Sequence, residues 1–379
     1  MVMSAKNVLI LGINGSIDIF NGIVGFAKEQ GWNLMIEDPA TLPGIPRCDG
    51  IIVTLLDLPD KLRITRRAIH DGIPVLDITD EIHMDGVSRV TVDFSAAGAM
   101  SARHFAERGF RRAAWFSMDS YAMHGLVKAG FGNVWRGDPV LDWTCLTRNG
   151  TKSLEDFLHT ALTKARKPIA VLTFNTYNAY RLLNSCLTAG IQVPNEIAIL
   201  SATNETPYLD SAHSKTISYV IFDYEELGRK AARELGRIMS GKPPSDTLRI
   251  APTRICLGDS TDTYTIDDPR LRAALVYIHD HLGEPLNAET IAAHVGISRI
   301  SLDRLFNSCS GHTTGREIRR QRMAAVHDLL TSTDMKLEAI AATTGTCHAS
   351  YLIKTFAREY GMTPAKYRAL HFRRRQRKT

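Results

Sequence analysis

The chain has 379 residues, a net charge of +6 and a hydrophobic fraction of 44%. These values are ordinary for a globular protein with two or three domains. It contains no run of eighteen apolar residues, so we expect no membrane span and a cytoplasmic protein. Its six cysteines include no Cys-x-x-Cys pair, which favours reduced thiols.

The first 258 residues alternate predicted strands and helices. Apolar runs predict strands at 8–11, 33–36, 50–54, 74–78, 90–92, 113–117, 169–173, 197–201 and 217–220. Amphipathic patterns predict helices at 20–30, 61–70, 96–108, 154–165, 178–189 and 224–239. Such alternation implies parallel sheets covered on both faces, and nine runs favour two subdomains.

A polar, turn-rich stretch at 259–268 then predicts a linker. Beyond it, a short helix, a glycine turn and a second helix occur twice, with turn glycines at Gly296 and Gly345. Glycine suits a turn that needs positive φ. Two helix-turn-helix motifs in one chain predict an all-α domain at 269–372 that reads two successive turns of double-stranded DNA. A single motif of this kind would fit an ordinary helical hairpin equally well.

The second helix of each motif presents side chains that the apolar stripe does not use. We expect them to face DNA: Arg299, Ile300, Asp303, Arg304, His348, Ala349, Ser350, Ile353 and Lys354. Charge agrees, because residues 266–379 carry 18 Lys or Arg against 11 Asp or Glu, a net of +7, while the rest nets −1. The basic tail at 373–379 fits either a phosphate contact or a solvated end.

These residues resemble the DNA-binding domain of the AraC/XylS transcription regulators. The resemblance rests on Ala292-Ala-His-Val-Gly-Ile-Ser298 and most specifically on Phe356-Ala-Arg-Glu-Tyr-Gly-Met-Thr-Pro-Ala-Lys-Tyr-Arg368. It covers residues 266–370. The family usually has an aromatic residue after the second turn glycine. Thr346 stands there in this chain, which we expect to loosen the second motif.

Residues 1–258 resemble the periplasmic-binding-protein-like effector domain of LacI-type repressors. The matching segments include Asp49-Gly-Ile-Ile-Val53, Gly190-Ile-Gln-Val-Pro194 and Leu227-Gly-Arg-Lys-Ala-Ala232. The combination is similar to regulators of the xylose-operon type. It implies a two-lobed α/β sensor with parallel sheets, which also forms a dimer, followed by the DNA-binding domain.

In this class the effector lies between the lobes, where strands end. The resemblance places candidates at Asn14, Ser16, Asp77, Asp119, Tyr121, Asn175, Thr176, Thr203, Asn204 and Asp223. The family's Arg four residues before the Phe of Gly130-Phe131 is Val127 here, and carboxylates common beside two Asn residues are Thr176 and Thr203. We therefore expect a small neutral polar effector, such as a sugar, or else a degenerate pocket that serves only dimerisation.

No complete phosphate loop, dinucleotide fingerprint or His-Glu-x-x-His motif occurs, so we expect no enzyme activity, cofactor or metal. The favoured function is a ligand-responsive, sequence-specific transcription regulator of carbohydrate-utilisation genes. The alternative is a ligand-binding or sugar-processing protein with an accessory helical domain. The effector, the operator, the direction of regulation and contact with RNA polymerase stay open.

Overall fold

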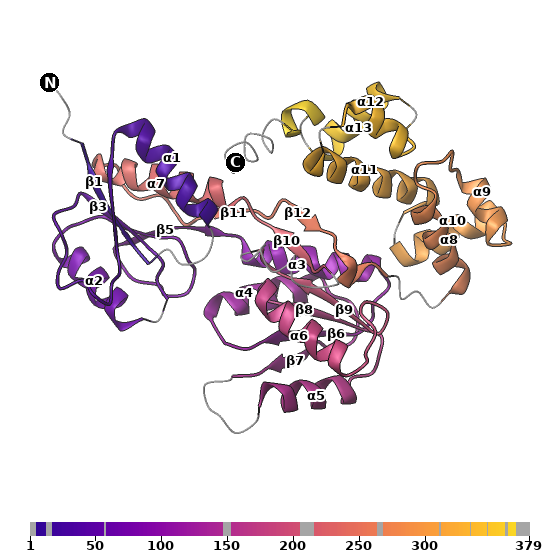
Figure 1. The fold of residues 1–379 in the computed structure, drawn as a ribbon, viewed down its shortest axis with the longest axis horizontal. Helices are drawn as coiled ribbons and strands as arrows, with labels where there is room; N and C mark the ends of the chain where they lie inside the picture. Colours follow the sequence, from indigo (N-terminus) through magenta and orange to yellow (C-terminus); the bar gives the residue numbers. More distant parts are fainter. Residues whose placement is uncertain are drawn as a thin grey trace. The chain divides into compact units, whose positions relative to one another are not determined.

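The computed structural model describes residues 5–12, 17–56, 58–146, 153–204, 216–263, 268–310, 312–333, 335–346, 348–360 and 363–368. The chain divides into two compact units, Met1–Thr263 and Tyr264–Thr379, called here the N-terminal and C-terminal units (Figure 1). No helix within the described ranges is both long and apolar enough to cross a membrane.

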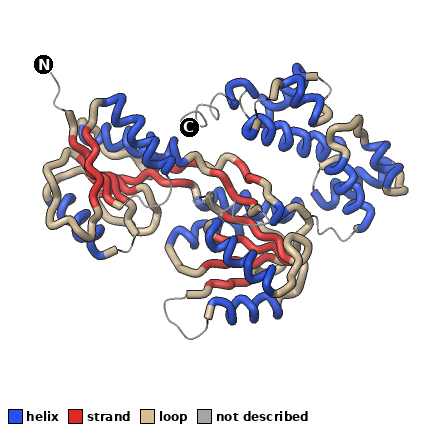
Figure 2. The backbone as a smooth tube through the Cα atoms, in the orientation of Figure 1, coloured by secondary structure: helices blue, strands red, loops and turns tan. Residues whose placement is uncertain are grey.

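The N-terminal unit contains two six-stranded sheets, each the centre of one lobe (Figures 1 and 2). The first lobe has the strand order β11-β5-β4-β3-β1-β2 and the second has β12-β10-β9-β8-β6-β7. All pairings are parallel except β10 with β12. The strands are β1 (Asn7–Leu11), β2 (Asn33–Glu37), β3 (Gly50–Val53), β4 (Val75–Asp77), β5 (Val87–Val92), β6 (Ala113–Ser117), β7 (Leu141–Thr144), β8 (Ile169–Thr173), β9 (Ile197–Ser201), β10 (Ser218–Ile221), β11 (Leu248–Ile250) and β12 (Arg254–Cys256).

Helices cover both faces of each sheet. They are α1 (Ile17–Gln30), α2 (Pro59–His70), α3 (Phe94–Glu107), α4 (Ala122–Val134), α5 (Leu154–Lys164), α6 (Thr176–Thr188) and α7 (Tyr224–Met239). Alternation along β1 decides the faces of the first lobe: Val8 and Ile10 pack toward α1 and α7, and Leu9 and Leu11 pack toward α2. In the second lobe α3 and α4 cover one face, and α5 and α6 cover the other.

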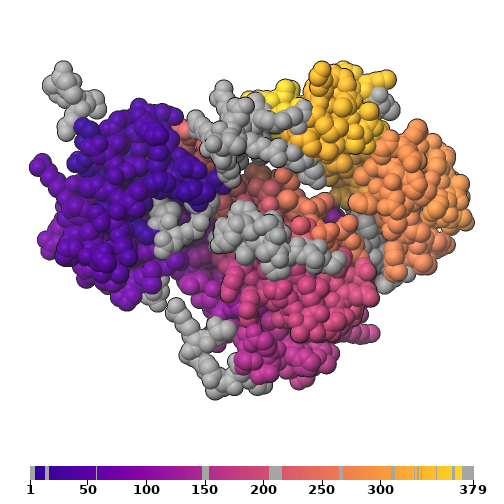
Figure 3. Space-filling view, viewed as in Figure 1, coloured from indigo at the N-terminus to yellow at the C-terminus, as the bar shows by residue number. Residues whose placement is uncertain are grey.

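The chain passes between the lobes three times, after β5, after β10 and after β11. The first two crossings have the same local structure. Asp93 caps α3 by accepting from the Ala96 N–H at 2.8 Å, and Asp223 caps α7 by accepting from the Glu226 N–H at 2.9 Å. Figure 3 shows the first lobe mainly in indigo and the second lobe mainly in magenta, adjoining each other.

Each lobe contains one pair of helices whose backbones cross closely, α3 with α4 and α1 with α7. A Cβ added at Gly130 in α4 would lie 1.9 Å from the Ser95 carbonyl oxygen in α3, and one at Gly98 would lie 2.0 Å from the Val127 oxygen. The first lobe repeats this arrangement, because a Cβ at Gly228 in α7 would lie 1.9 Å from the Ile19 oxygen in α1. In each pair the helix backbones touch directly, which only glycine permits.

The C-terminal unit consists of helices. They are α8 (Pro269–Asp280), α9 (Ala288–His294), α10 (Arg299–Ser310), α11 (Thr314–Ser332), α12 (Leu337–Thr343) and α13 (Ala349–Tyr360). Gly296 and Gly345 have φ values of 70° and 64°, which confirms the turns predicted for both motifs. Each motif has its own core, with Leu302 and Phe306 in the first and Leu352 and Phe356 in the second. Helix α11 contributes Ile318 to one core and Val326 to the other.

The nine predicted strands of the N-terminal unit are confirmed, with shifts of up to three residues at their ends. Helix α4 and strands β7 and β12 were not predicted. The expected linker also differs, because Asp259–Thr261 forms a short 3-10 helix (η3) whose Ser260 and Thr261 are fully buried. The first unit therefore extends to Thr263 rather than to residue 258.

Candidate effector cleft and DNA-reading face

A cavity of about 300 Å³ lies between the two lobes of the N-terminal unit. Its size is at the lower end for small-molecule sites. Its described lining consists of Ile19, Thr54, Leu56, Ile78, Thr79, Val92, Phe94, Asp119, Tyr121, Met123, Phe174, Asn175, Tyr224 and Leu227. Most of these side chains are apolar or aromatic, and a few polar groups converge among them. This composition suits a small ligand with both hydroxyl groups and apolar faces.

Three of the residues predicted from the sequence line this cavity: Asp119, Tyr121 and Asn175. Asn175 also caps α6, because its Oδ1 accepts from the Asn178 N–H at 2.9 Å. The cap occupies that oxygen, so the amide nitrogen is the group of Asn175 that can donate to a ligand. Asn14 and Ser16 lie outside the described residues.

The other five predicted effector residues are absent from the lining, and their side chains have structural contacts instead. Thr203 donates to the Phe174 carbonyl at 3.0 Å, and Asn204 accepts from the Phe222 N–H at 3.2 Å. Asp223 caps α7, and Thr176 is buried at the start of α6. The fifth, Asp77, anchors two loops at the strand ends.

Asp77 is fully buried beneath the cavity. Its carboxylate accepts from the Leu55 N–H at 2.9 Å, from the Thr79 N–H at 3.0 Å and from the Thr79 hydroxyl at 2.8 Å. Arg89 Nε lies 3.2 Å away. Burial raises the pKa of Asp77 to about 6, although these hydrogen bonds and the Arg89 charge act in the opposite direction. Asp77 thus holds the segments that place Leu56 and Thr79 in the cavity.

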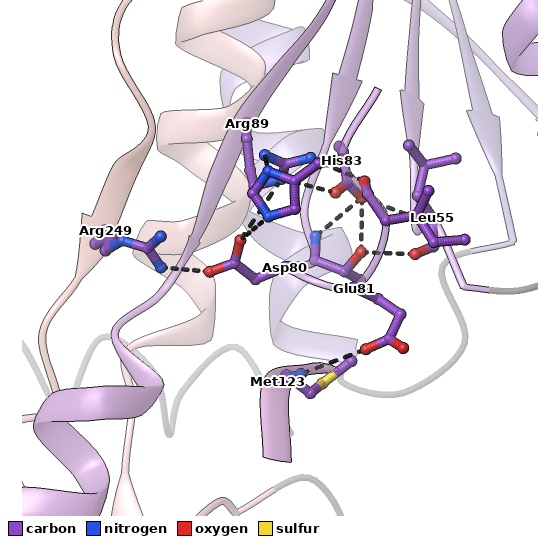
Figure 4. Close-up of polar contacts among 10 residues, drawn as sticks. Leu55, Asp80, Glu81, His83, Arg89, Met123 and Arg249 are labelled. Carbon is purple, nitrogen blue, oxygen red and sulfur yellow. Dashed lines mark hydrogen bonds and ion pairs between the residues drawn. The ribbon is translucent and has the colours of Figure 1, made fainter. Parts of the chain in front are cut away.

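The loop between β4 and β5 of the first lobe also contacts the second lobe (Figure 4). The buried Asp80 carboxylate pairs with Arg249 of β11 and lies 3.3 Å from His83 Nε2. The next residue, Glu81, accepts from the Met123 N–H at 3.4 Å. Glu81 belongs to the first lobe and Met123 lies in the first turn of α4 of the second, so this contact bridges the lobes beside the cavity.

Four of the lining residues that were not predicted share a position in the sequence. Thr54, Thr79, Phe94 and Phe174 each come within two residues after a strand, β3, β4, β5 or β8. The rule that ligands bind beyond the carboxyl ends of parallel strands would have found them. Tyr224 and Met123 do not fit this rule, because they lie three residues after β10 and six residues after β6, within helices α7 and α4.

Helix α3 joins the cavity to the end of the N-terminal unit. Phe94 at its start lines the cavity. At its other end His104 Nε2 lies 3.0 Å from the Thr261 hydroxyl, and Arg108 Nε donates to the Thr261 carbonyl at 2.8 Å. Both side chains are buried. Thr261 is two residues before the end of the unit, so α3, with fourteen residues and a length of about 21 Å, extends from the cavity to the end of the N-terminal unit.

The predicted DNA-reading residues lie on α10, at the start of α13 and at His348 just before it. Ile300, Arg304, His348, Ser350 and Lys354 are exposed, and Ala349 and Ile353 are half-buried. Arg299 is exposed but pairs with Glu289 at 2.5 Å. Asp303 accepts from the N–H of Thr314, the first residue of α11, at 3.0 Å. The free cationic groups among the predicted readers of α10 and α13 are therefore Arg304 and Lys354, within the described residues.

Thr346 does not leave a loose turn in the second motif. Its side chain is 4% exposed, and its hydroxyl lies 2.8 Å from that of Thr344 and 3.2 Å from the Ala341 carbonyl. Thr344 in turn donates to the Ile340 carbonyl at 2.8 Å. Hydrogen bonds hold the turn where the family uses an aromatic side chain, so the expected loosening is wrong for this geometry.

Comparison with protein families gives two matches that follow the division of the chain. Residues 102–261 match a periplasmic binding protein-like domain, and residues 291–370 match a helix-turn-helix domain. The chain is 24% identical over 368 residues to the xylose operon regulatory protein of Escherichia coli K12, covering 90% of each. It is 35% identical over 104 residues to the regulatory protein PocR of Salmonella typhimurium, which covers 27% of this chain and 34% of PocR.

Solved structures share the fold. The xylose-binding transcription activator xylR aligns with a TM-score of 0.60 at 20% identity, covering 98% of this chain and 99% of that one. The transcriptional regulator CelR in complex with cellobiose aligns with a TM-score of 0.56 at 16% identity, covering 67% of this chain and 84% of that one. The chain is therefore a DNA-binding transcription regulator that combines a periplasmic-binding-protein-like effector domain with an AraC-type helix-turn-helix domain, and it is similar over most of its length to the xylose operon regulatory protein.

Proposed function

We propose that this regulator controls carbohydrate-utilisation genes in the cytoplasm, binding its operator through α10 and α13 in response to a sugar bound between its lobes. The strongest support is that one chain contains both features that this function needs. It has a cavity between its lobes with a few polar groups in the lining, and two exposed recognition helices. The relatives named for a xylose operon support the sugar class. Within this proposal the N-terminal unit binds its ligand without converting it.

The route of the signal in this proposal is α3. A ligand changes a distant domain only if it binds one conformation better than another. Closure of the lobes on a ligand moves Phe94 at the start of α3, and the helix carries the displacement to His104 and Arg108. These two side chains hold Thr261, so the start of the connection to the C-terminal unit moves with them.

The effector site is tested by Asn175→Ser. Serine keeps an oxygen that caps α6 but removes the amide donor, whereas alanine would also cost about 1 kcal/mol of cap energy. We expect the sugar concentration that gives half of the maximal change in DNA binding to rise roughly two- to tenfold, which is the effect of losing one hydrogen bond. Basal DNA affinity should be unchanged. Gel-shift titrations with D-xylose, L-arabinose, D-ribose and D-glucose measure both, and no response of the wild type to any of them contradicts the sugar proposal.

The DNA-reading face is tested by Arg304→Ala. Arginine reads guanine by paired hydrogen bonds in the major groove, and Arg304 is exposed on α10 without an acidic partner among the described residues. We expect a loss of about 1–3 kcal/mol on DNA that the wild type selects from a random pool, and little loss on unselected DNA. Fluorescence anisotropy on both duplexes measures this. An equal loss on both would show that Arg304 contacts phosphate only.

We also infer that the regulator is a homodimer assembled by its N-terminal unit, because regulators of two half-sites commonly have two-fold symmetry. Light scattering on the full chain and on residues 1–263 should give a dimer in both cases. A monomeric N-terminal unit at micromolar concentration would contradict this assignment.

A further inference from the structure

His124 in α4 has a buried imidazole that lies next to the cavity lining. It is 3% exposed and lies among aromatic rings, with centroid distances of 4.1 Å to Phe174, 5.4 Å to Tyr121 and 5.5 Å to Trp115. Two of these rings, those of Phe174 and Tyr121, line the cavity between the lobes. His124 also lies one helical turn before Val127, on the same face of α4.

The Nε2 atom of His124 has no hydrogen-bond partner among the described residues. Its nearest charged neighbour is the Asp119 carboxylate, whose Oδ1 is 3.6 Å away, too far for a hydrogen bond. Asp119 lines the cavity and is fixed by the Ser117 hydroxyl at 2.9 Å. Burial lowers the pKa of His124 to about 4, although the Asp119 charge acts in the opposite direction, so the ring is neutral at pH 7.

We propose that His124 and Asp119 form a hydroxyl-binding pair that determines the effector class of the cavity, a neutral polyhydroxy compound. A hydroxyl donates one hydrogen bond and accepts others. The neutral ring carries one proton: if that proton is on Nε2, a ligand hydroxyl accepts from His124 and donates to the Asp119 carboxylate, and if it is on Nδ1, the hydroxyl donates to Nε2. Phe174 and Tyr121 then contact the ligand's C–H groups. An acidic ligand group is repelled by Asp119. This inference rests on the proposed effector site.

The buried Nε2 atom of His124 also affects the stability of the ligand-free protein. A buried polar atom that lacks a partner destabilises the folded state. If the function of His124 is to bind a ligand, its replacement by phenylalanine should not lower the stability of the ligand-free protein, because the neighbouring side chains are aromatic. His104 is the matched control, since it is 6% exposed and both of its ring nitrogens have partners, Thr261 at 3.0 Å and Arg108 at 3.1 Å.

The first measurement is thermal unfolding of the ligand-free full chain, followed by tryptophan fluorescence, for His124→Phe and His104→Phe. We expect the Tm of His124→Phe to equal or exceed that of the wild type, while His104→Phe lowers it by several degrees. An equal fall in Tm for both variants would overturn the proposal, because it would give His124 a structural role.

The second measurement is calorimetric binding of D-xylose, L-arabinose, D-ribose, D-glucose and D-glucuronate. For the neutral sugar that the wild type binds, His124→Phe and Asp119→Ala should each weaken affinity at least tenfold, and His124→Gln should recover part of the loss. Binding by His124→Phe within twofold of the wild type, or preference for D-glucuronate, overturns the proposal. If the wild type binds no sugar, the proposed function fails, and the unfolding comparison still decides whether His124 is structural.

Discussion

Gly130→Ala is expected to destabilise the N-terminal unit by about 2–3 kcal/mol or more, the cost of overpacking a tight contact. The added Cβ would lie 1.9 Å from the Ser95 carbonyl oxygen and 2.6 Å from its carbon. Both atoms are backbone, so no side chain can rotate away and α3 must separate from α4. This loss exceeds the gain of about 0.5–1 kcal/mol that alanine normally brings to a helix interior.

The same helix supplies the controls. A Cβ at Gly125 or Gly132 would meet nothing within 4 Å. Gly125→Ala and Gly132→Ala should therefore stabilise slightly or have no effect, and the sign of the change reverses within two residues. Denaturant unfolding followed by tryptophan fluorescence isolates this unit, because all four tryptophans lie in it. A neutral Gly130→Ala would show that the helices do not cross at this distance.

Glu317→Gln is expected to destabilise the C-terminal unit by about 3 kcal/mol at pH 7. The Glu317 side chain is 3% exposed, and its carboxylate accepts from Arg320 at 2.7 and 2.9 Å, from Gln321 at 2.8 Å and from His312 at 2.7 Å. Burial opposes its ionisation, but Arg320 and these hydrogen bonds prevail and hold the pKa of Glu317 at about 2. Lowering the pKa of Glu317 from 4.5 to about 2 stabilises the folded state by about 3 kcal/mol, because one pKa unit corresponds to about 1.36 kcal/mol.

The pH dependence of this contribution has a definite sign. Because the folded-state pKa is depressed, the stabilisation is complete above pH 4.5 and disappears as the pH falls toward 2. The stability difference between wild type and Glu317→Gln should shrink over the same range. Far-UV circular dichroism detects this unit, which contains no tryptophan. The exposed Glu289 provides a control, and a Glu289→Gln effect of similar size would contradict the assigned role of burial.

The sequence by itself determined the features that depend on neighbouring residues in the chain. Gly296 and Gly345 turn where predicted, since the requirement for positive φ is local, and the apolar spacing around them places Leu302 and Leu352 in their cores. Continuous apolar runs likewise identified the central strands β1, β3, β8 and β9, which are buried on both faces.

The tertiary structure decided what depends on distant partners. Helix α4 was missed because three glycines lower its helix propensity, and only the crossing with α3 explains why Gly130 is there. Strands β11 and β12 have three residues each and exist through pairing with β5 and β10. The polar composition of 259–268 predicted a linker, but Thr261 is buried by His104 and Arg108, more than 150 residues away.

The same distinction applies to the candidate sites. Asp119, Tyr121 and Asn175 were expected near the effector because they follow strands. They line the cavity because the carboxyl ends of parallel strands converge there. Sequence could not show that the carboxylates of Asp77 and Asp303 accept hydrogen bonds from backbone N–H groups. Nor could it show that a buried nitrogen of His124 has no hydrogen-bond partner among the described residues. Whether a polar atom is free for a ligand depends on what surrounds it in space, and only the folded chain determines that.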